Sequence, residues 1–193
     1  ARDIVLMKTV GIHPVIVHGG GPQIEKSLKR NKIISEFING SRITSKEMIG
    51  IVEKVLNNEI NKDISNLIRM SGGKPSKFSG SKNSPVIASK NKSSRLGEVG
   101  EIISVKKKIL KKSIETGKIP VISPIGWSRM GDPLNINADF VACAIAASLK
   151  AEKIILLTDI SGIKDETGKK ISTITIKEAK KLIKNKKNIK GGM

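Results

Sequence analysis

Cysteine, aromatic residues and long apolar runs are scarce in this chain of 193 residues. A single cysteine, Cys143, excludes a framework of disulfide bonds. Aromatic residues make up 2% of the chain and tyrosine is absent, which leaves few surfaces on which nucleic-acid bases could stack. No apolar run reaches the roughly 18 residues that a membrane-spanning helix needs. The first residues also lack the basic start and unbroken apolar stretch of a signal peptide.

Residue types that bind zinc or act as nucleophiles are equally few. The histidines are His13 and His18, and together with one cysteine they supply no set of zinc ligands. Cys143 falls in an apolar, helical segment that we expect to be buried, so we expect its thiol to be inert. The Gly-x-Ser-x-Gly motif of serine hydrolases does not occur. We therefore expect neither a protein-bound metal centre nor a covalent nucleophile.

Basic residues are abundant, and the formal net charge is +19. Nucleic-acid binding is one explanation of this charge, and a compositional preference for lysine at exposed positions is another. Thirty lysines against six arginines favour the second explanation, because phosphate and base recognition uses arginine forks. The lysines are also spread along the chain. We expect no nucleic-acid partner and no membrane partner.

Short apolar runs alternate with helical patterns along the chain. Buried strands are expected at residues 14–17, 119–123 and 153–157, with a further strand at 99–105. Helices are expected at residues 22–30, 44–70, 105–116, 138–149 and 175–184. Strands that alternate with helices in this way predict an α/β fold with a mainly parallel sheet.

The longest helical pattern starts at Thr44 and Glu47, which have the spacing of a capping box. Its apolar stripe continues to Met70, where two glycines end the pattern. The stripe is wide enough to contact both a core and a partner subunit. Thr175 and Glu178 repeat the capping-box spacing at the start of the last helix.

Three glycines follow the first expected strand, between His18 and Pro22. Their backbone N–H groups could approach an anion closely, and the following helix would add its positive N-terminal end. The segment matches neither the Walker pattern nor the dinucleotide pattern G-x-G-x-x-G. On spacing alone, a phosphate-binding turn and an ordinary tight turn both remain open.

Polar residues gather at three further places where ligands of parallel sheets bind. Arg42 precedes a helix start, where it could hold a carboxylate or lie on the surface. Asn135, Asn137 and Asp139 lead into an apolar helix. Asn137 could simply cap that helix while Asp139 favours its dipole, or the group could orient cationic ligands.

The third place is the end of the expected strand 153–157. Thr158 and Asp159 follow it, and Gly162 lies in the next turn. These residues could hold the sugar or phosphates of a nucleotide, or Asp159 could bond its own backbone in an ordinary turn.

Taken in order, these segments resemble the amino acid kinase family, and within it the members that phosphorylate N-acetyl-L-glutamate. The resemblance covers nearly the whole chain and is carried by VIVHGGGP, GSRIT, LGEVGEI, NINAD, KIILLTDISGI and GGM. It implies a three-layer α/β sandwich with a mainly parallel open sheet. Residues 1–150 would form the lobe for acyl amino acid binding and dimerisation, and residues 151–193 would start the ATP-binding lobe.

The resemblance also implies a reaction and its residues. The γ-phosphoryl group of ATP, with Mg²⁺, would pass to the side-chain carboxylate of N-acetyl-L-glutamate, an early step of arginine biosynthesis. The catalytic residues would be Gly19, Gly20 and Asp139. The two glycines would bind the phosphoryl group and the substrate, and Asp139 would orient catalytic lysines. The substrate would also contact Arg42, Asn135 and Asn137. The nucleotide would contact Thr158, Asp159 and Gly162.

The chain departs from the family pattern at its two ends. The K-x-G-G strand that opens family members does not occur, and no lysine follows the GGM segment. We therefore expect a fragment of a longer enzyme, incomplete for catalysis by itself. The family further implies a homodimer or higher homo-oligomer, in the cytoplasm or the plastid stroma. Some members also bind a PII signalling protein, a partner that no segment of this chain predicts.

Three other interpretations compete with this one. A sister kinase acting on aspartate, glutamate, carbamate or UMP would share the fold, but the segment around Arg42 and the NINAD segment disfavour it. A catalytically inactive remnant would fold and dimerise without turning over ATP. A non-catalytic basic protein would bind nucleic acid in a salt-sensitive way.

Overall fold

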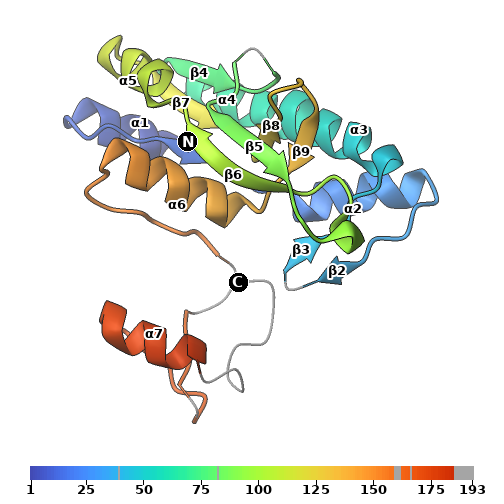
Figure 1. Cartoon of the computed structure of the whole chain (residues 1–193). Coiled ribbons are helices and arrows are strands. Elements are labelled where there is room, and N and C mark those ends of the chain that lie inside the picture. The colour runs from blue at the N-terminus through green and yellow to red at the C-terminus, as the bar shows by residue number, and fades with distance from the viewer. Residues whose placement is uncertain (39, 82, 159–161, 166, 185–193) are drawn as a thin grey trace. The chain divides into compact units, whose positions relative to one another are not determined.

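The computed structural model describes residues 1–38, 40–81, 83–158, 162–165 and 167–184. The chain divides into two units, Ala1–Ile154 and Ile155–Met193 (Figure 1). The first half of the first unit contains α1 (Arg2–Thr9), β1 (Ile16–Val17), α2 (Gly21–Arg30), β2 (Phe37–Ile38), β3 (Ser41–Arg42), α3 (Lys46–Lys54), the π-helical turn η1 (Val55–Ile60), α4 (Asn61–Met70) and β4 (Pro75–Phe78). The second half contains β5 (Val86–Lys90), η2 (Ser94–Leu96), β6 (Gly100–Val105), α5 (Lys107–Glu115), β7 (Ile119–Ile122), β8 (Ile125–Trp127), β9 (Pro133–Asn135) and α6 (Ala138–Leu149).

A parallel sheet with the strand order β1–β7–β4 lies at the centre of the first unit. Ile16 pairs with Val121 on one side of β7, and Pro75 pairs with Ile119 on the other. All four residues of β7 are buried, as expected for a central strand whose two faces are both covered by helices. The mainly parallel sheet predicted from the sequence is therefore confirmed.

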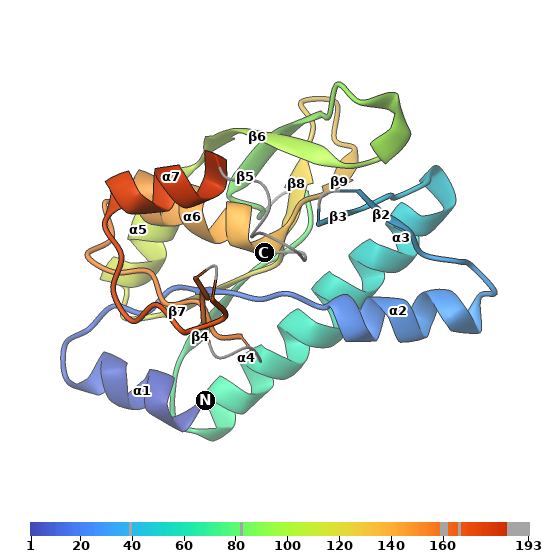
Figure 2. The same ribbon diagram turned by 90° about the horizontal axis from the view of Figure 1, so that it is seen from below.

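Two apolar cores lie on opposite faces of this sheet, because successive strand residues point to opposite sides. Val121 packs with Ile68 of α4 and with residues of α1. Ile122, the next residue, packs with Leu110 of α5 and Val141 of α6. Figure 2 shows α4 on one side of the β4 and β7 strands and α5 and α6 on the other. Helices, sheet and helices make the predicted three-layer α/β sandwich.

A second, mixed sheet with the order β6–β5–β8–β9 extends this unit. Its β5–β6 and β8–β9 pairs are antiparallel, whereas β5 and β8 are parallel. Trp127 lies at the end of β8, and its ring packs against the apolar cluster formed by α2 and α3. It is therefore a packing residue.

The long helix predicted from residue 44 to residue 70 is present as α3, η1 and α4, which follow one another without a break (Figures 1 and 2). Its cap differs from the prediction. Ser45, not Thr44, is the N-cap, and its Oγ accepts a hydrogen bond from the Met48 N–H at 3.2 Å. The Thr44 hydroxyl instead donates to the Arg42 carbonyl at 2.9 Å, so it is already engaged outside the helix.

The predicted strand at residues 153–157 is wrong. These residues have no strand pairing, and Leu157 is 93% exposed. An apolar run becomes a strand only where a neighbouring strand bonds its N–H and C=O groups. No described residue pairs in this way with residues 153–157.

Two helices also differ from the sequence-based expectations. Arg2–Thr9 forms α1 although no helical pattern was assigned there, because Ile4 and Val5 pack against Ile68. The helix α6 was expected to be buried nearly all round, but only Val141 and Ile145 are buried, and Cys143 is exposed. Neighbouring elements of the first unit cover only one face of α6.

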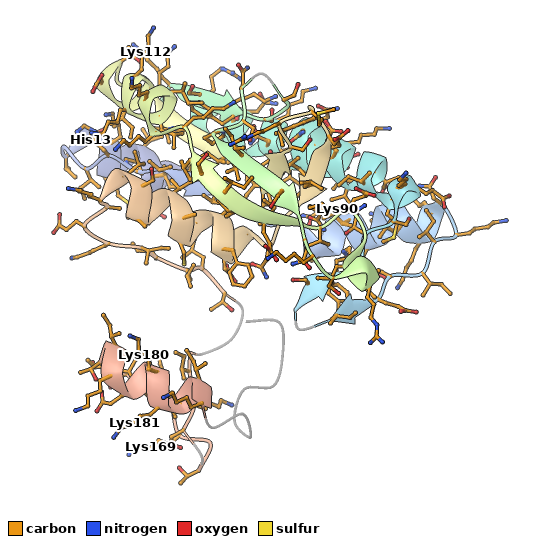
Figure 3. All side chains as sticks on the ribbon, in the orientation of Figure 1. His13, Lys90, Lys112, Lys169, Lys180 and Lys181 are labelled. Atoms are coloured by element: carbon orange, nitrogen blue, oxygen red, sulfur yellow. The ribbon has the colours of Figure 1, made fainter. Side chains whose placement is uncertain are left out.

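The second unit contains the helix α7 (Ile176–Lys184), which starts with the predicted capping box. The Thr175 N–H donates to Glu178 Oε2 at 2.8 Å, and the Glu178 N–H donates to Thr175 Oγ1 at 3.3 Å. Lys180 and Lys181 project from this helix, and Lys112 projects from α5 in the other unit (Figure 3). Lysine amines are thus distributed over both units. Among the described residues, no helix is long and apolar enough to cross a membrane.

The cores on the two faces of the sheet predict that truncating a buried strand isoleucine lowers the free energy of unfolding much more than truncating an exposed one. Ile122→Ala removes a side chain that is 0% exposed and should lower the free energy of unfolding by about 2–5 kcal/mol. Ile103→Ala on β6 deletes the same atoms from a side chain that is 51% exposed. It should change the free energy of unfolding by under about 1 kcal/mol. Urea unfolding followed by circular dichroism measures both. Equal losses would contradict the assignment of Ile122 to the core.

Candidate functional site

The three glycines lie in the turn that joins β1 to α2. The His18 N–H donates to the Ile122 carbonyl at 3.2 Å, which continues the β1–β7 pairing to the edge of the turn. The helix then starts at Gly21, with Pro22 in its first turn, where a missing N–H costs no hydrogen bond. Within the described part of the chain, no hydrogen bond takes up the N–H groups of Gly19 and Gly20. These donors are available to a ligand.

The turn packs against the long helix at Gly20. A Cβ atom on Gly20 would lie 2.5 Å from Ile60 Cδ1 and 2.8 Å from Leu56 Cδ2. A side chain at this position would therefore displace the ends of both of these side chains, and Leu56 is buried. Gly20 therefore allows the backbone to approach the helix more closely than any other residue would.

His18 is buried beside the turn and bonded through both ring nitrogens. Nδ1 lies 2.9 Å from the Gly19 carbonyl oxygen, and Nε2 lies 3.2 Å from Asn61 Nδ2 of α4. Burial lowers the pKa of His18 below its ordinary value, and the bond to the Gly19 carbonyl offsets part of this effect. The ring is thus neutral at pH 7.

Arg42, at the end of β3, is a buried cation held by several groups. Its Nη1 donates to Glu25 Oε2 at 2.9 Å and also to Ser35 Oγ. Its guanidinium carbon lies 4.5 Å from the centre of the Phe37 ring. Burial lowers the pKa of Arg42 and Glu25 raises it, and an arginine stays charged under both influences. A positive charge with a fixed direction is therefore present at this position.

Asn135 ties the end of β9 to the residues around Arg42. Its Nδ2 donates to Thr44 Oγ1 at 3.0 Å, and its backbone N–H donates to the Glu98 carbonyl at 2.9 Å. The Thr44 carbonyl in turn accepts from the Glu98 N–H at 2.6 Å. Gly97 precedes Glu98 with φ of +70°, and a Cβ there would collide with the Thr44 carbonyl oxygen. Backbone and side-chain bonds thus fix Asn135 relative to Arg42.

Asn137 and Asp139 lie at the start of α6. The Asn137 side chain accepts a hydrogen bond from the Asp139 N–H at 2.8 Å and is the N-cap of the helix. The capping role that the sequence left open is therefore real. It does not remove Asn137 and Asp139 from the site, because both line the cavity described next.

One cavity of about 250 Å³ joins these groups within the first unit. Its lining includes all the predicted catalytic and substrate residues, namely Gly19, Gly20, Arg42, Asn135, Asn137 and Asp139. Among the described residues that line it, Arg42 and Asp139 carry the charges. The N-terminal ends of α2 and α6 both open onto it, and the partial positive charge of a helix N-terminus favours anions. A ligand with more than one anionic group fits these surroundings.

The residues predicted to bind a nucleotide follow the first unit in the chain. Thr158 and Gly162 belong to the second unit, where Thr158 is exposed and Gly162 has φ of +121°. Asp159 lies outside the described residues. Their role as nucleotide ligands stays a prediction.

Sequence reasoning missed the groups that hold Arg42 and the glycine turn. Glu25, on α2, and Phe37, on β2, fix the guanidinium. Asn61 and Asn57 point from the long helix to the ends of β1 and β7, where the Ser123 hydroxyl donates to Asn57. A signal was present, since two asparagines interrupt the apolar face of the predicted helix at a spacing of four residues.

Comparison with known proteins agrees with this geometry. The amino acid kinase family matches residues 1–193. "Acetylglutamate kinase" of Geobacter sp. (strain M21) is 42% identical over 204 residues, which span 100% of this chain and 70% of the relative. "Acetylglutamate kinase" of Sulfurihydrogenibium sp. (strain YO3AOP1) is 44% identical over 211 residues, with the same coverage.

Solved structures share the fold. The protein smu.665 from Streptococcus mutans UA159 superposes with a TM-score of 0.91 at 31% identity, over 99% of this chain and 77% of that chain. N-acetylglutamate synthase from Neisseria gonorrhoeae, complexed with coenzyme A and N-acetyl-glutamate, superposes with a TM-score of 0.82 at 22% identity, over 95% of this chain and 42% of that chain. The second likeness is one of fold alone. The family match over the whole chain, together with relatives above 40% identity, establishes that this chain belongs to the amino acid kinase family.

Proposed function

We propose that this chain is a phosphotransferase that moves the γ-phosphoryl group of ATP to the side-chain carboxylate of N-acetyl-L-glutamate, in arginine biosynthesis. The observation that carries the proposal is the cavity, where a fixed arginine, two asparagines, a carboxylate and two unused glycine N–H groups meet. The relatives named acetylglutamate kinase, at 42–44% identity, support the same substrate.

Arg42 would bind the α-carboxylate of the substrate. A guanidinium presents parallel N–H donors that match the two oxygens of a carboxylate. In Arg42, Nη1 is occupied by Glu25 and Ser35, and Nη2 makes one long bond of 3.5 Å to the Gly21 carbonyl. The Nη2 side of the fork therefore faces few competing acceptors. The amides of Asn135 and Asn137 lie on the same cavity wall for the acetamido group and the substrate chain.

The transfer needs no general base. The attacking group is a carboxylate with a solution pKa of about 4.3, so it is ionised at pH 7. One of its oxygens forms a bond to the γ-phosphorus as the bond from that phosphorus to the ADP oxygen breaks, and ADP carries away the electron pair. The difficulty is the repulsion between two anions, which backbone N–H donors and cations in the site can offset.

Gly19 and Gly20 would supply such donors, and Asp139 would orient the cationic groups that approach the phosphates. Both glycines and Asp139 line the cavity, so the donors and the carboxylate face the same small volume. The N-terminus of α2, which starts at Gly21, adds its partial positive charge.

ATP and Mg²⁺ are the cofactors of this proposal. Among the described residues no group of three or more His, Cys, Asp or Glu side chains could hold a metal ion. This fits Mg²⁺, which in phosphoryl transfer is held mainly by phosphates and water with one or two carboxylates, and which would neutralise phosphate charge there. Thr158, Asp159 and Gly162 are the residues that we propose for the nucleotide.

We also propose that the two parts of the chain bind different ligands, as the resemblance to the family implied. Residues 1–150 would bind the acyl amino acid and form a homodimer, and residues 151–193 would contribute to ATP binding. The described residues that line the cavity all lie in the first part, which supports the first assignment. Exposed apolar side chains on α4, Leu67 and Met70, support a partner subunit on that helix.

ADP release tests the reaction. With ATP, Mg²⁺ and N-acetyl-L-glutamate, this chain extended to the full length of its relatives, of which it spans 70%, should release ADP in a coupled assay. L-Aspartate, L-glutamate, carbamate or UMP should not replace the acceptor. Asp139→Asn should lower kcat about 10²–10³-fold, because it removes the charge that orients cations in the transition state. Asp132→Asn, in an exposed loop, is the matched control. Equal rates with L-aspartate would favour a sister kinase instead.

Arg42→Lys tests the carboxylate assignment. Lysine keeps the charge and loses the fork, so KM for N-acetyl-L-glutamate should rise about 10-fold or more while kcat changes less. Against 4-acetamidobutyrate, which lacks the α-carboxylate, the variant and the unmutated protein should have the same KM. Arg30→Lys on the exposed end of α2 should behave like the unmutated protein. A KM difference that persists with 4-acetamidobutyrate would show that Arg42 does not bind this group.

A further inference from the structure

The hydrogen bonds around His18 are compatible with one arrangement of protons. The Gly19 carbonyl oxygen can only accept, so Nδ1, at 2.9 Å from it, must carry the proton. The ring is neutral because burial disfavours its charged form. Nε2 is then a bare acceptor, and the group that faces it at 3.2 Å is the amide nitrogen of Asn61.

Asn61 is oriented by the strand behind it. Its Nδ2 also donates to the Val121 carbonyl of β7 at 3.0 Å. Turning the amide over would place Oδ1 against the Val121 oxygen and the Nε2 lone pair, which would set acceptor against acceptor. Both N–H groups of Asn61 are thus committed, one to the central strand and one to His18. Asn61 is fully buried, so water does not compete for these bonds.

The bond from His18 to Gly19 fixes a peptide plane of the turn. In a trans peptide the C=O of one residue and the N–H of the next point in opposite directions. The Gly19 carbonyl points to the buried imidazole, so the Gly20 N–H points away from it. Leu56 and Ile60 of η1 lie beside Gly20 on the helix side, since a Cβ atom built there would come within 2.8 Å of both side chains.

From this geometry we infer that His18 and Asn61 are positioning residues that aim the Gly20 N–H at the transferring phosphoryl group. The inference rests on the proposed function, since the N–H must have a phosphoryl group to meet. Neither side chain is among the residues that line the cavity, so their effect is transmitted through the turn. The chain of contacts runs from Val121 to Asn61, to His18, to the Gly19–Gly20 peptide.

Nitrogen NMR of the imidazoles tests the arrangement without any substitution at His18. The chain has two histidines, so two ring systems appear, and the exposed His13 is an internal reference. His18 should show the neutral form protonated at Nδ1 at pH 7. Asn61→Asp replaces the donor by an acceptor and should put a second proton on the His18 ring while leaving His13 unchanged. An Nε2-protonated neutral ring in the unmutated protein would overturn the inference.

Two substitutions of His18 separate positioning from packing. In His18→Asn the amide nitrogen is bonded to Cγ, as Nδ1 is, so a donor to the Gly19 carbonyl remains. In His18→Leu the bulk remains and the donor is lost. A positioning role predicts that His18→Leu lowers kcat about 10²-fold with a small change in KM. It also predicts that His18→Asn keeps most of the kcat that His18→Leu loses. A packing role predicts the reverse order, because leucine suits a buried site better than asparagine. His13→Gln should be silent.

The outcomes distinguish this inference from the proposed function. An unmutated protein of the relatives' full length that releases no ADP with N-acetyl-L-glutamate contradicts the function itself. If the unmutated protein is active and His18→Leu keeps its kcat, only the positioning role is contradicted. The same holds if the kcat of His18→Asn is no higher than that of His18→Leu. Where the Leu variant fails to fold, the NMR form of His18 in the unmutated protein decides.

Discussion

Gly20 lies so close to the long helix that a Cβ atom there would displace the ends of the Leu56 and Ile60 side chains. Gly20 packs directly on Leu56 and Ile60, and that approach sets the depth of the turn relative to the ends of the parallel strands. Because α2 starts from the turn, the same contact also places Glu25, which holds Arg42. The contact between Gly20 and the π-helical turn therefore bears on the backbone donors and on one of the groups that hold the buried cation, and Ser35 and Phe37 hold that cation independently. Such π-helical turns often occur at functional sites.

The cavity holds donors for anions, together with the carboxylate of Asp139, before any ligand enters it. Arg42 is buried and already oriented by Glu25 and Phe37, so binding a carboxylate requires little ordering of its side chain. Two helices begin at the cavity, and their N-terminal ends add partial positive charge without adding mobile groups. A substrate carboxylate and a phosphoryl group repel each other in water, and these fixed dipoles can compensate part of that repulsion.

Local signals in the sequence predicted the parts of the fold that depend on neighbouring residues. The turn from His18 to Pro22 and the Asn137 cap follow from local chemistry and are present. The strand expected at 153–157 failed because pairing depends on a distant neighbour, which no short pattern contains. The bonds of Arg42 to Glu25 and of Asn61 to His18 join residues 17 and 43 positions apart. Such pairs follow from the packing of helices on the sheet, so only the structure could reveal them.

Backbone amide NMR with N-acetyl-L-glutamate tests the central claim most directly, because it reports where the ligand binds whether or not phosphoryl transfer follows. The account predicts that titration shifts the N–H signals of Gly19 and Gly20, the amide signals of Asn135 and Asn137, and the guanidinium signal of Arg42, while signals of α5 do not move. L-Glutamate without the acetyl group should produce smaller shifts at the same concentration. Shifts confined to other surfaces, or absent at the glycine turn, would contradict the account.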